Sequence, residues 1–175
     1  ISFFEKRFIV VNHGVANIFS PPKIAVNREN FLLAVSDIYV QKNFMNLIYS
    51  FKLLKIDHPS LTLKIAGRAI DKDYFKALKK IIFDNKLEND IHFLGNVKSV
   101  ELVKLYQKCS IFVFPSTIET FGNPLLEAMA CGAPVACSDT TAMPEVAGNA
   151  AKFFDPFNIN SMVQVINSLL KDKKQ

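Results

Sequence analysis

Short apolar runs alternate with amphipathic segments from about residue 30 to the end of the chain. Apolar runs that stop at a turn residue predict buried parallel strands, and they lie at 31–35, 61–66, 91–94, 110–114, 134–137 and 151–154. Between them, apolar residues at helical spacing predict helices over 43–54, 74–83, 101–106, 124–131 and 159–170. Strands that alternate with helices indicate an α/β fold, a doubly wound parallel sheet of about six strands with right-handed crossovers.

The fold class by itself points to two loops. In such sheets ligands bind beyond the carboxyl ends of the strands, at the point where the strand order reverses. If the order is the common 3-2-1-4-5-6, that crevice lies between residues 36–42 and residues 115–123. Residues 6–11 predict a lone strand without a following helix, so we interpret residues 1–22 as a linker and residues 23–175 as the domain.

Composition and charge narrow the class of protein. The chain has 175 residues, of which 50% are hydrophobic and 21% charged, which excludes a disordered or collagen-like chain. No apolar run approaches the roughly 18–20 residues of a membrane-spanning helix. The net charge of +5 comes largely from lysines at helical spacing, which favours a solvated surface, with an anionic membrane surface or a partner domain as the alternative. We expect no nucleic-acid partner, and the spacing of Cys109, Cys131 and Cys137 favours core thiols over a metal site.

The predicted crevice contains a helix start that could bind an anion. No G-x-G-x-x-G or P-loop motif is present among the six glycines, so the common nucleotide-binding fingerprints are missing. Glu119 follows the fourth strand, and Gly122 and Asn123 precede Pro124. We expect Asn123 to cap the helix that begins at Pro124. Backbone N–H groups at such a terminus suit a diphosphate, although an ordinary capped helix explains the same pattern.

Two charged residues near these loops each have a functional and a structural interpretation. Glu127 is the one polar residue in the apolar segment 125–131, and a buried carboxylate needs partners. Those partners are either a structural ion pair or a ligand with two adjacent hydroxyls, such as a ribose. Lys42 stands at the start of the helix after the first strand, where it either reaches a phosphate or is an ordinary surface lysine.

At this point the sequence resembles a known family. Residues 115–135 read PSTIETFGNPLLEAMACGAPV, which resembles the signature of family 4 retaining glycosyltransferases of the GT-B fold. Glu119 and Glu127, eight positions apart, match the paired glutamates of that family. Further segments that resemble the family are 35–43, 63–67, 93–97, 143–148 and 155–156. The resemblance implies a Rossmann-like domain, the C-terminal, donor-binding half of a GT-B fold, preceded by a missing N-terminal domain.

The resemblance also implies a role for each matching residue. Glu127 would hold the ribose hydroxyls of the nucleotide, and Glu119, one of two catalytic residues, would contact hydroxyls of the donor sugar. Lys42, the other, would neutralise charge on the leaving diphosphate, and the backbone around Val97 would meet the base. The backbone N–H groups that would face the sugar and the diphosphate are those of Phe121, Gly122 and Asn123.

One departure from the family concerns the phosphate loop. Where the family commonly has Gly and Arg after the first strand, this chain has Ser36 and Asp37. Ser36 stays a candidate donor-binding residue, whereas the Asp37 carboxylate would repel a diphosphate and is expected to point away or bind elsewhere. Arg68, after the second strand, is the candidate for the substitute positive charge.

Together these matches imply a hexosyltransferase that uses a nucleotide-diphosphate sugar as donor and needs no metal or cofactor. It would move the sugar to an acceptor hydroxyl with the anomeric configuration kept, in bacterial polysaccharide or lipopolysaccharide biosynthesis. The acceptor, a glycan or lipid-linked saccharide, would bind mainly to the missing domain, so we expect this fragment alone to be inactive. We expect a cytoplasmic protein with peripheral contact at the inner face of the cell membrane. The alternatives are a non-catalytic, degenerate nucleotide-sugar-binding module and a GT-B epimerase.

Overall fold

The computed structural model describes residues 13–172, and the strand predicted at residues 6–11 lies outside them. Its centre is one sheet of six parallel strands in the order β3-β2-β1-β4-β5-β6. The strands are β1 (Glu29–Val35), β2 (Thr62–Ala66), β3 (Ile91–Gly95), β4 (Cys109–Phe114), β5 (Val135–Ser138) and β6 (Lys152–Phe154). The six predicted strands are confirmed, and their order is the common one on which the expected position of the crevice depended. The order reverses between β1 and β4, so the loops that follow these two neighbouring strands border the crevice expected at the carboxyl edge of the sheet.

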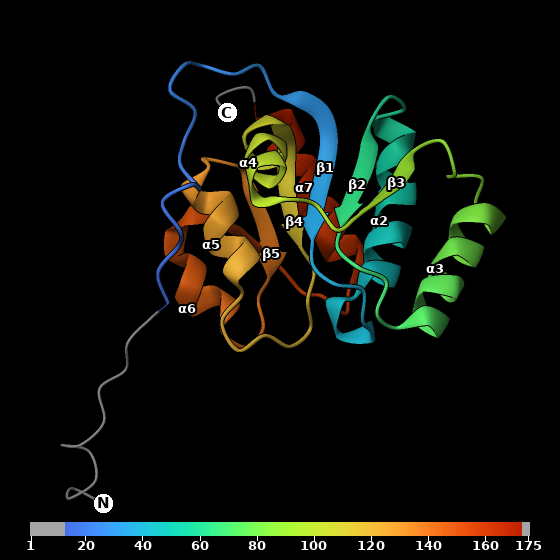
Figure 1. Ribbon diagram of the computed structural model, residues 1–175. Coiled ribbons are helices and arrows are strands. Elements are labelled where there is room, and N and C mark those ends of the chain that lie inside the picture. The colour runs from blue at the N-terminus through green and yellow to red at the C-terminus, as the bar shows by residue number, and fades with distance from the viewer. Residues whose placement is uncertain (1–12, 173–175) are drawn as a thin grey trace, which may run out of the picture.

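Helices cover both faces of the sheet (Figure 1). They are α2 (Phe44–Asp57), α3 (Lys72–Asp84), α4 (Ser99–Lys108), α5 (Asn123–Ala130), α6 (Met143–Ala147) and α7 (Ile159–Lys171), with 3₁₀ turns η1 (Val40–Lys42) and η2 (Gly148–Ala150). Five of these helices were predicted. Helix α6 and the two 3₁₀ turns were not, because elements of three to five residues are too short to show a period of 3.6.

The apolar core has two layers, one on each side of the sheet. Alternate residues of β1 point to opposite faces: Leu32 and Ala34 pack under α2, α3 and α7, whereas Phe31 and Leu33 pack under α4, α5 and α6. All four are buried, which is why the sequence of this strand is continuously apolar rather than alternating. The core therefore leaves the two ends of the strands, and not the faces of the sheet, as the places where polar groups can gather.

A close backbone approach joins the loops after β1 and β2 at the carboxyl edge. The Ser36 N–H donates to the Ala66 carbonyl oxygen at 2.9 Å, and the Gly67 N–H donates to the Gly95 carbonyl oxygen at 2.8 Å. A Cβ atom on Gly67 would lie 1.9 Å from the carbonyl oxygen of Ser36, and the φ angle of Gly67 is +149°. Only glycine fits there, and the contact places the residues that follow, Asp37 and Arg68, side by side.

Candidate functional site

The loops after β1 and β4 meet at the carboxyl edge, as the topology predicts. The Thr117 N–H donates to the carbonyl oxygen of Gln41 at 2.9 Å, and the Thr117 hydroxyl donates to the same oxygen at 3.2 Å. In Figure 1 both loops lie on the lower side of the sheet, where the strands end. Residues 36–42 and 115–122 thus form one continuous edge at the strand-order reversal.

Lys42 and Glu119 form an ion pair across this edge. The Lys42 Nζ lies 2.5 Å from the Glu119 Oε1, although the residues are 77 positions apart in the sequence. The two side chains are 20% and 13% exposed, so solvent screens the pair only partly. Each charge neutralises the other, and both side chains remain partly exposed.

Lys42 is oriented by a left-handed corner of the backbone. It ends η1, and Asn43, with φ at 55°, stands between η1 and α2. Asparagine tolerates this conformation better than most residues. Its buried side-chain amide donates to the Pro156 carbonyl oxygen at 2.8 Å, which ties the corner to the loop after β6.

The start of α5 differs from the prediction. The N-cap is Gly122, in the left-handed region with φ at 88°, and Asn123 is the first helical residue. Among the described residues no side chain caps this terminus, so the expectation that Asn123 caps the helix was wrong. The chain turns one residue earlier than predicted because the left-handed Gly122 places Asn123 inside the helix, where its side chain no longer faces the free N–H groups.

Glu127 has a hydrogen-bond partner that the sequence did not indicate. The hydroxyl of Tyr106, a fully buried residue, donates to the Glu127 Oε2 at 2.9 Å. Burial raises the pKa of the Glu127 carboxyl, and the hydrogen bond from Tyr106 opposes that shift. No cation within residues 13–172 lies at ion-pair distance from Glu127. The ion-pair alternative is therefore wrong for this part of the chain, and the hydroxyl-ligand alternative stays a prediction.

Helix α5 is not buried all round, contrary to the reasoning from its apolar sequence. Leu126, Met129 and Ala130 are only partly buried, and the helix borders two hollows. One, of about 220 Å³, is lined by Glu127, Asn123, Leu126 and residues of the segment 14–19. The other, of about 130 Å³, is lined by Phe121, Leu126, His13, Glu145 and Val146. Leu126 lines both hollows, so the hollow beside Glu127 adjoins the hollow beside Phe121.

Asp37 is neutralised by Arg68. The Arg68 guanidinium donates to both carboxylate oxygens of Asp37, with the Nη2–Oδ2 distance at 2.5 Å. The Arg68 backbone N–H donates to Asp37 Oδ1 at 2.9 Å. These contacts hold the pKa of the Asp37 carboxyl below its usual range. The expectation that Asp37 binds elsewhere is thus confirmed, while the charge assigned to Arg68 is shared with Asp37 and is not free.

Val97 and Ser36 line neither of the two hollows beside α5. Val97 follows β3, packs against the core layer under α4, and lines a hollow of about 470 Å³ together with Leu94 and Leu105. This hollow is separate from the two beside α5 in its lining residues. Ser36 bonds through its backbone N–H to the neighbouring Ala66 carbonyl, so that N–H has a partner within the sheet edge.

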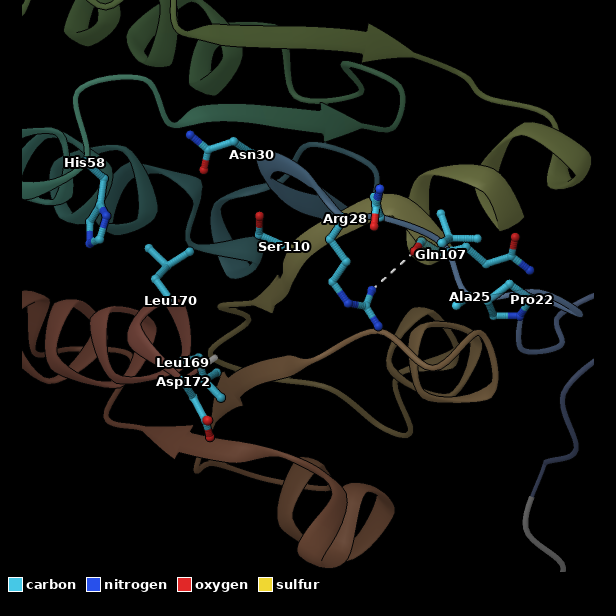
Figure 2. A pocket seen from close by; sticks show the side chains of 12 residues that line it. Pro22, Ala25, Arg28, Asn30, His58, Gln107, Ser110, Leu169, Leu170 and Asp172 are labelled. Atoms are coloured by element: carbon cyan, nitrogen blue, oxygen red, sulfur yellow. Dashed lines mark hydrogen bonds between the residues drawn. The ribbon is translucent and has the colours of Figure 1, made fainter. Parts of the chain in front are cut away.

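A larger hollow of about 550 Å³ lies at the opposite, amino end of the strands (Figure 2). Arg28 is its most chemically distinctive side chain, and Figure 2 shows its guanidinium turned to the backbone of Gln107. The same guanidinium also donates to the carbonyl oxygens of Cys109 and Gly132. Arg28 therefore serves to join backbone segments, and the hollow lies on the wrong edge of a parallel sheet for a ligand site of this fold class.

Within residues 13–172, no group of three or more His, Cys, Asp or Glu side chains is placed to hold a metal ion. None of the helices in the same part of the chain is long and apolar enough to cross a membrane. The absence of any need for a metal, and the cytoplasmic location, stay predictions.

Comparison with known protein sequences gives one family. A family model described as glycosyl transferases group 1 matches residues 17–175. The O-antigen chain mannosyltransferase B of Escherichia coli is 33% identical over 146 residues, which are 82% of this chain and 38% of that protein. The O-antigen chain mannosyltransferase RfbU of Salmonella typhimurium is 34% identical over 165 residues, 94% of this chain and 44% of that protein. The chain thus spans about two fifths of the length of these relatives.

Comparison with solved structures gives the fold. The C-terminal domain of a glycosyl transferase group 1 family protein from Francisella tularensis superposes with a TM-score of 0.79 at 22% identity, over 93% of this chain and 90% of that one. Anabaena Alr3699/HepE, in complex with UDP and glucose, gives a TM-score of 0.76 at 25% identity, over 85% of this chain and 40% of that one. The expected Rossmann-like fold, the C-terminal half of a GT-B architecture, is confirmed.

Proposed function

The chain belongs to the glycosyl transferases group 1 family, and we propose that its crevice binds the nucleotide-diphosphate sugar donor of a sugar-transfer reaction. The observation that carries the proposal is the Lys42–Glu119 pair, in which two loops bring opposite charges to 2.5 Å at the strand-order reversal. An ammonium and a carboxylate at that point match the two halves of such a donor, the diphosphate and the sugar hydroxyls.

Lys42 would bind the diphosphate. Its partly buried ammonium is paired with one carboxylate, so an incoming diphosphate competes with Glu119 for it. As the bond from the sugar to the diphosphate breaks, negative charge grows on the leaving oxygen. A cation already held at that point stabilises that charge without reorganisation.

Glu119 would bind the donor sugar. A carboxylate accepts hydrogen bonds from sugar hydroxyls, but it repels a diphosphate that carries no sugar. The site would therefore favour the intact donor over the bare nucleoside diphosphate, because only the donor supplies hydroxyls that offset the Glu119 charge. The left-handed turn at Gly122 leads the chain from Glu119 to the N-terminus of α5, where backbone N–H groups of residues 121–123 would face the same ligand.

Glu127 would bind the ribose. It is anchored through one oxygen, Oε2, by Tyr106, and it borders the 220 Å³ hollow. A carboxylate fixed in this way accepts hydrogen bonds from two adjacent hydroxyls with little loss of side-chain entropy. The base would lie toward the backbone around Val97.

The reaction proposed for the whole protein is transfer to an acceptor hydroxyl with the anomeric configuration kept. The acceptor would bind mainly to a further domain, and this chain alone would bind a donor without turning it over. Because two relatives are O-antigen mannosyltransferases, we propose bacterial polysaccharide or lipopolysaccharide assembly as the setting and a mannose nucleotide as the first donor to test. A cytoplasmic location with contact at the inner membrane face belongs to the same proposal.

A thermal-shift panel tests donor binding. GDP-mannose, UDP-glucose, GDP, UDP and the two nucleosides are added to the chain, since a ligand that binds the native state raises its melting temperature. At a hundredfold excess over Kd the gain is about 2.7 kcal/mol, or roughly 5–11 °C for a domain of this size. A Lys42→Ala variant should lose the gain from diphosphates, whereas the exposed Lys76→Ala should keep it. No shift with any probe would refute the proposal.

One observation favours a second candidate, a binding module with a degenerate site. The positive charge of Arg68 is shared with Asp37, so the phosphate loop supplies less net positive charge than a loop with an unpaired arginine. Such a module would bind nucleotide and sugar nucleotide with equal, weak affinity, and the same panel separates the two candidates.

A further inference from the structure

Three hydroxyl groups, one from the last residue of β5 and two from the loop that follows it, contact the loop after β4 in succession. The Ser138 hydroxyl donates to the Ser116 carbonyl oxygen at 2.5 Å, and the Thr140 hydroxyl donates to the Thr117 carbonyl oxygen at 3.1 Å. The Thr141 hydroxyl accepts from the Glu119 N–H at 3.1 Å. Neither the family match nor the sequence pattern assigns a role to these three residues, and the last contact reaches the backbone of a residue in the proposed donor site.

Thr141 adopts a backbone conformation that is unfavourable for its type. Its φ angle is 52°, and a β-branched residue in the left-handed region is an outlier. Such conformations persist only where the surroundings enforce them, and they concentrate at functional sites. The strained position is the one whose hydroxyl holds Glu119.

The hydroxyl of Thr141 is oriented from its other side. Its hydrogen points to the Sδ of Met143 at 3.6 Å, and Met143 is a fully buried residue at the start of α6. With the hydrogen directed to sulfur, a lone pair of the oxygen is left for the Glu119 N–H. The short helix α6 thus fixes the sulfur, the sulfur orients the hydroxyl, and the hydroxyl fixes the amide of Glu119.

The loop after β4 is also held from the side of β1. The N–H and the hydroxyl of Thr117 both donate to the carbonyl oxygen of Gln41, the residue next to Lys42. The carbonyl oxygen of Thr117 accepts a hydrogen bond from the Thr140 hydroxyl. The backbone that presents Glu119 therefore lies between two anchors, one beside Lys42 and one at Thr141. Moving the second anchor would move Glu119 relative to Lys42.

We infer that Thr141 is a positioning residue that sets where the Glu119 carboxylate stands relative to the donor sugar. The inference rests on the proposed function, because it assigns Thr141 to the sugar part of the donor site and not to its nucleotide part. Thr141 acts through the Glu119 backbone and touches no substrate.

The test uses three substitutions at one position in the 175-residue chain. Thr141→Val keeps the shape and removes the acceptor, Thr141→Ser keeps the acceptor, and Thr141→Gly removes the acceptor and also relieves the backbone strain. Thr62→Val, at the amino end of β2, is the matched control. Calorimetry with GDP-mannose, UDP-glucose, GDP and UDP measures binding, and a melting curve measures stability.

Thr141→Val and Thr141→Gly should weaken the sugar nucleotide about three- to tenfold, the loss expected for one misplaced hydrogen bond. In both variants the affinity for the bare diphosphate should stay within about twofold of the wild-type value. Thr141→Ser and the control should bind both kinds of ligand with unchanged affinity. Thr141→Gly should melt at or above the wild-type temperature while it binds the sugar nucleotide less well. If Thr141 had a purely structural role, its substitution would lower the melting temperature and the affinity for all ligands together. That result would overturn the inference.

Amide hydrogen exchange at Glu119 gives a readout that needs no ligand. The Glu119 N–H should exchange faster in Thr141→Val than in the wild type and Thr141→Ser, since its acceptor is gone. If the wild type binds none of the four probes, the proposed function fails, and the exchange data still decide whether Thr141 positions Glu119. Two results overturn the inference while the proposed function stands. In the first, the Glu119 N–H of Thr141→Val exchanges at the wild-type rate. In the second, Thr141→Val binds the sugar nucleotide with wild-type affinity although Glu119→Gln binds it more weakly.

Discussion

Two substitutions at Glu127 separate its structural from its binding contribution. Glu127→Ala removes the acceptor of the fully buried Tyr106 hydroxyl, and an unsatisfied buried donor costs about 1–3 kcal/mol. For a chain of this length each kcal/mol lowers the melting temperature by about 2–4 °C. Glu127→Gln keeps a carbonyl oxygen for Tyr106 and removes only the charge, so its melting temperature should stay close to that of the wild type.

Ligand binding should respond to both changes. Hydrogen bonds from the ribose hydroxyls to a charged acceptor contribute about 1.5–3 kcal/mol, which corresponds to a loss of about 10- to 150-fold in nucleoside affinity. We expect this loss for Glu127→Ala and a large part of it for Glu127→Gln, measured by calorimetry with guanosine, uridine and their diphosphates. Glu88→Gln, an exposed residue in the turn before β3, is the matched control.

The outcome that refutes this reasoning is specific. If Glu127→Gln binds nucleosides as the wild type does, the carboxylate does not hold the ribose. If Glu127→Gln melts as far below the wild type as Glu127→Ala does, the charge itself stabilises the fold, and Glu127 is a structural residue after all.

Three further predictions concern the same edge of the sheet. Glu119→Gln should raise the affinity for GDP or UDP, because Lys42 loses a competing anion, and lower the affinity for the sugar nucleotide; calorimetry that shows both falling together would contradict this. Gly67→Ala should lower the free energy of unfolding, measured with urea, by about 3 kcal/mol or more, because its Cβ would lie 1.9 Å from the Ser36 carbonyl oxygen. An unchanged free energy of unfolding would mean that the two loops separate easily. Burial raises the pKa of Glu127 above the ordinary value of 4.5, so acidification should weaken nucleoside binding already above pH 4.5. The contribution of this carboxyl to the free energy of unfolding should increase as the pH falls through the raised pKa, because the folded state then binds the proton more tightly than the unfolded state. In Glu127→Gln neither pH effect should remain.

Local patterns were sufficient for the six strands and for five of the helices. The strands at 31–35 and 110–114 were predicted from apolar runs, and the structure extends each by one or two residues at its start. Both faces of these strands are covered, so burial is recorded directly in the sequence as continuous hydrophobicity. Helix α6 was missed because a helix of five residues that begins beside a proline has no periodicity to detect.

The sequence predicted where Lys42 and Glu119 lie, but it missed local details of the structure around the candidate site. The sequence directed Lys42 and Glu119 to the same crevice, because parallel strands bring their carboxyl ends to one edge, and the structure brings them into contact. It did not predict Tyr106 as the partner of Glu127, since a tyrosine in an amphipathic helix is most simply interpreted as core. It also missed the left-handed Gly122 cap, because asparagine is the better N-cap by residue type and Asn123 stands next to it.

Thr141 could not have been found from the sequence. Threonine occurs in loops for many reasons, and only the φ angle of 52° and the contact with Glu119 distinguish this one. A strained conformation is a property of how a loop is held by its neighbours, and residue type at that position does not report it.

The six strands, five of the helices and the edge of the sheet at which polar groups gather follow from the sequence alone, because hydrophobic periodicity gives the elements and a parallel sheet places its ligand site at the carboxyl ends of the strands. Only the tertiary structure decided which polar groups meet: Lys42 with Glu119, Arg68 with Asp37 and Tyr106 with Glu127. Each pair joins residues at least 21 positions apart, so its geometry depends on how distant segments fold together, as the close approach at Gly67 does for Asp37 and Arg68. Those are set by packing over the whole domain, which no local pattern of residues contains.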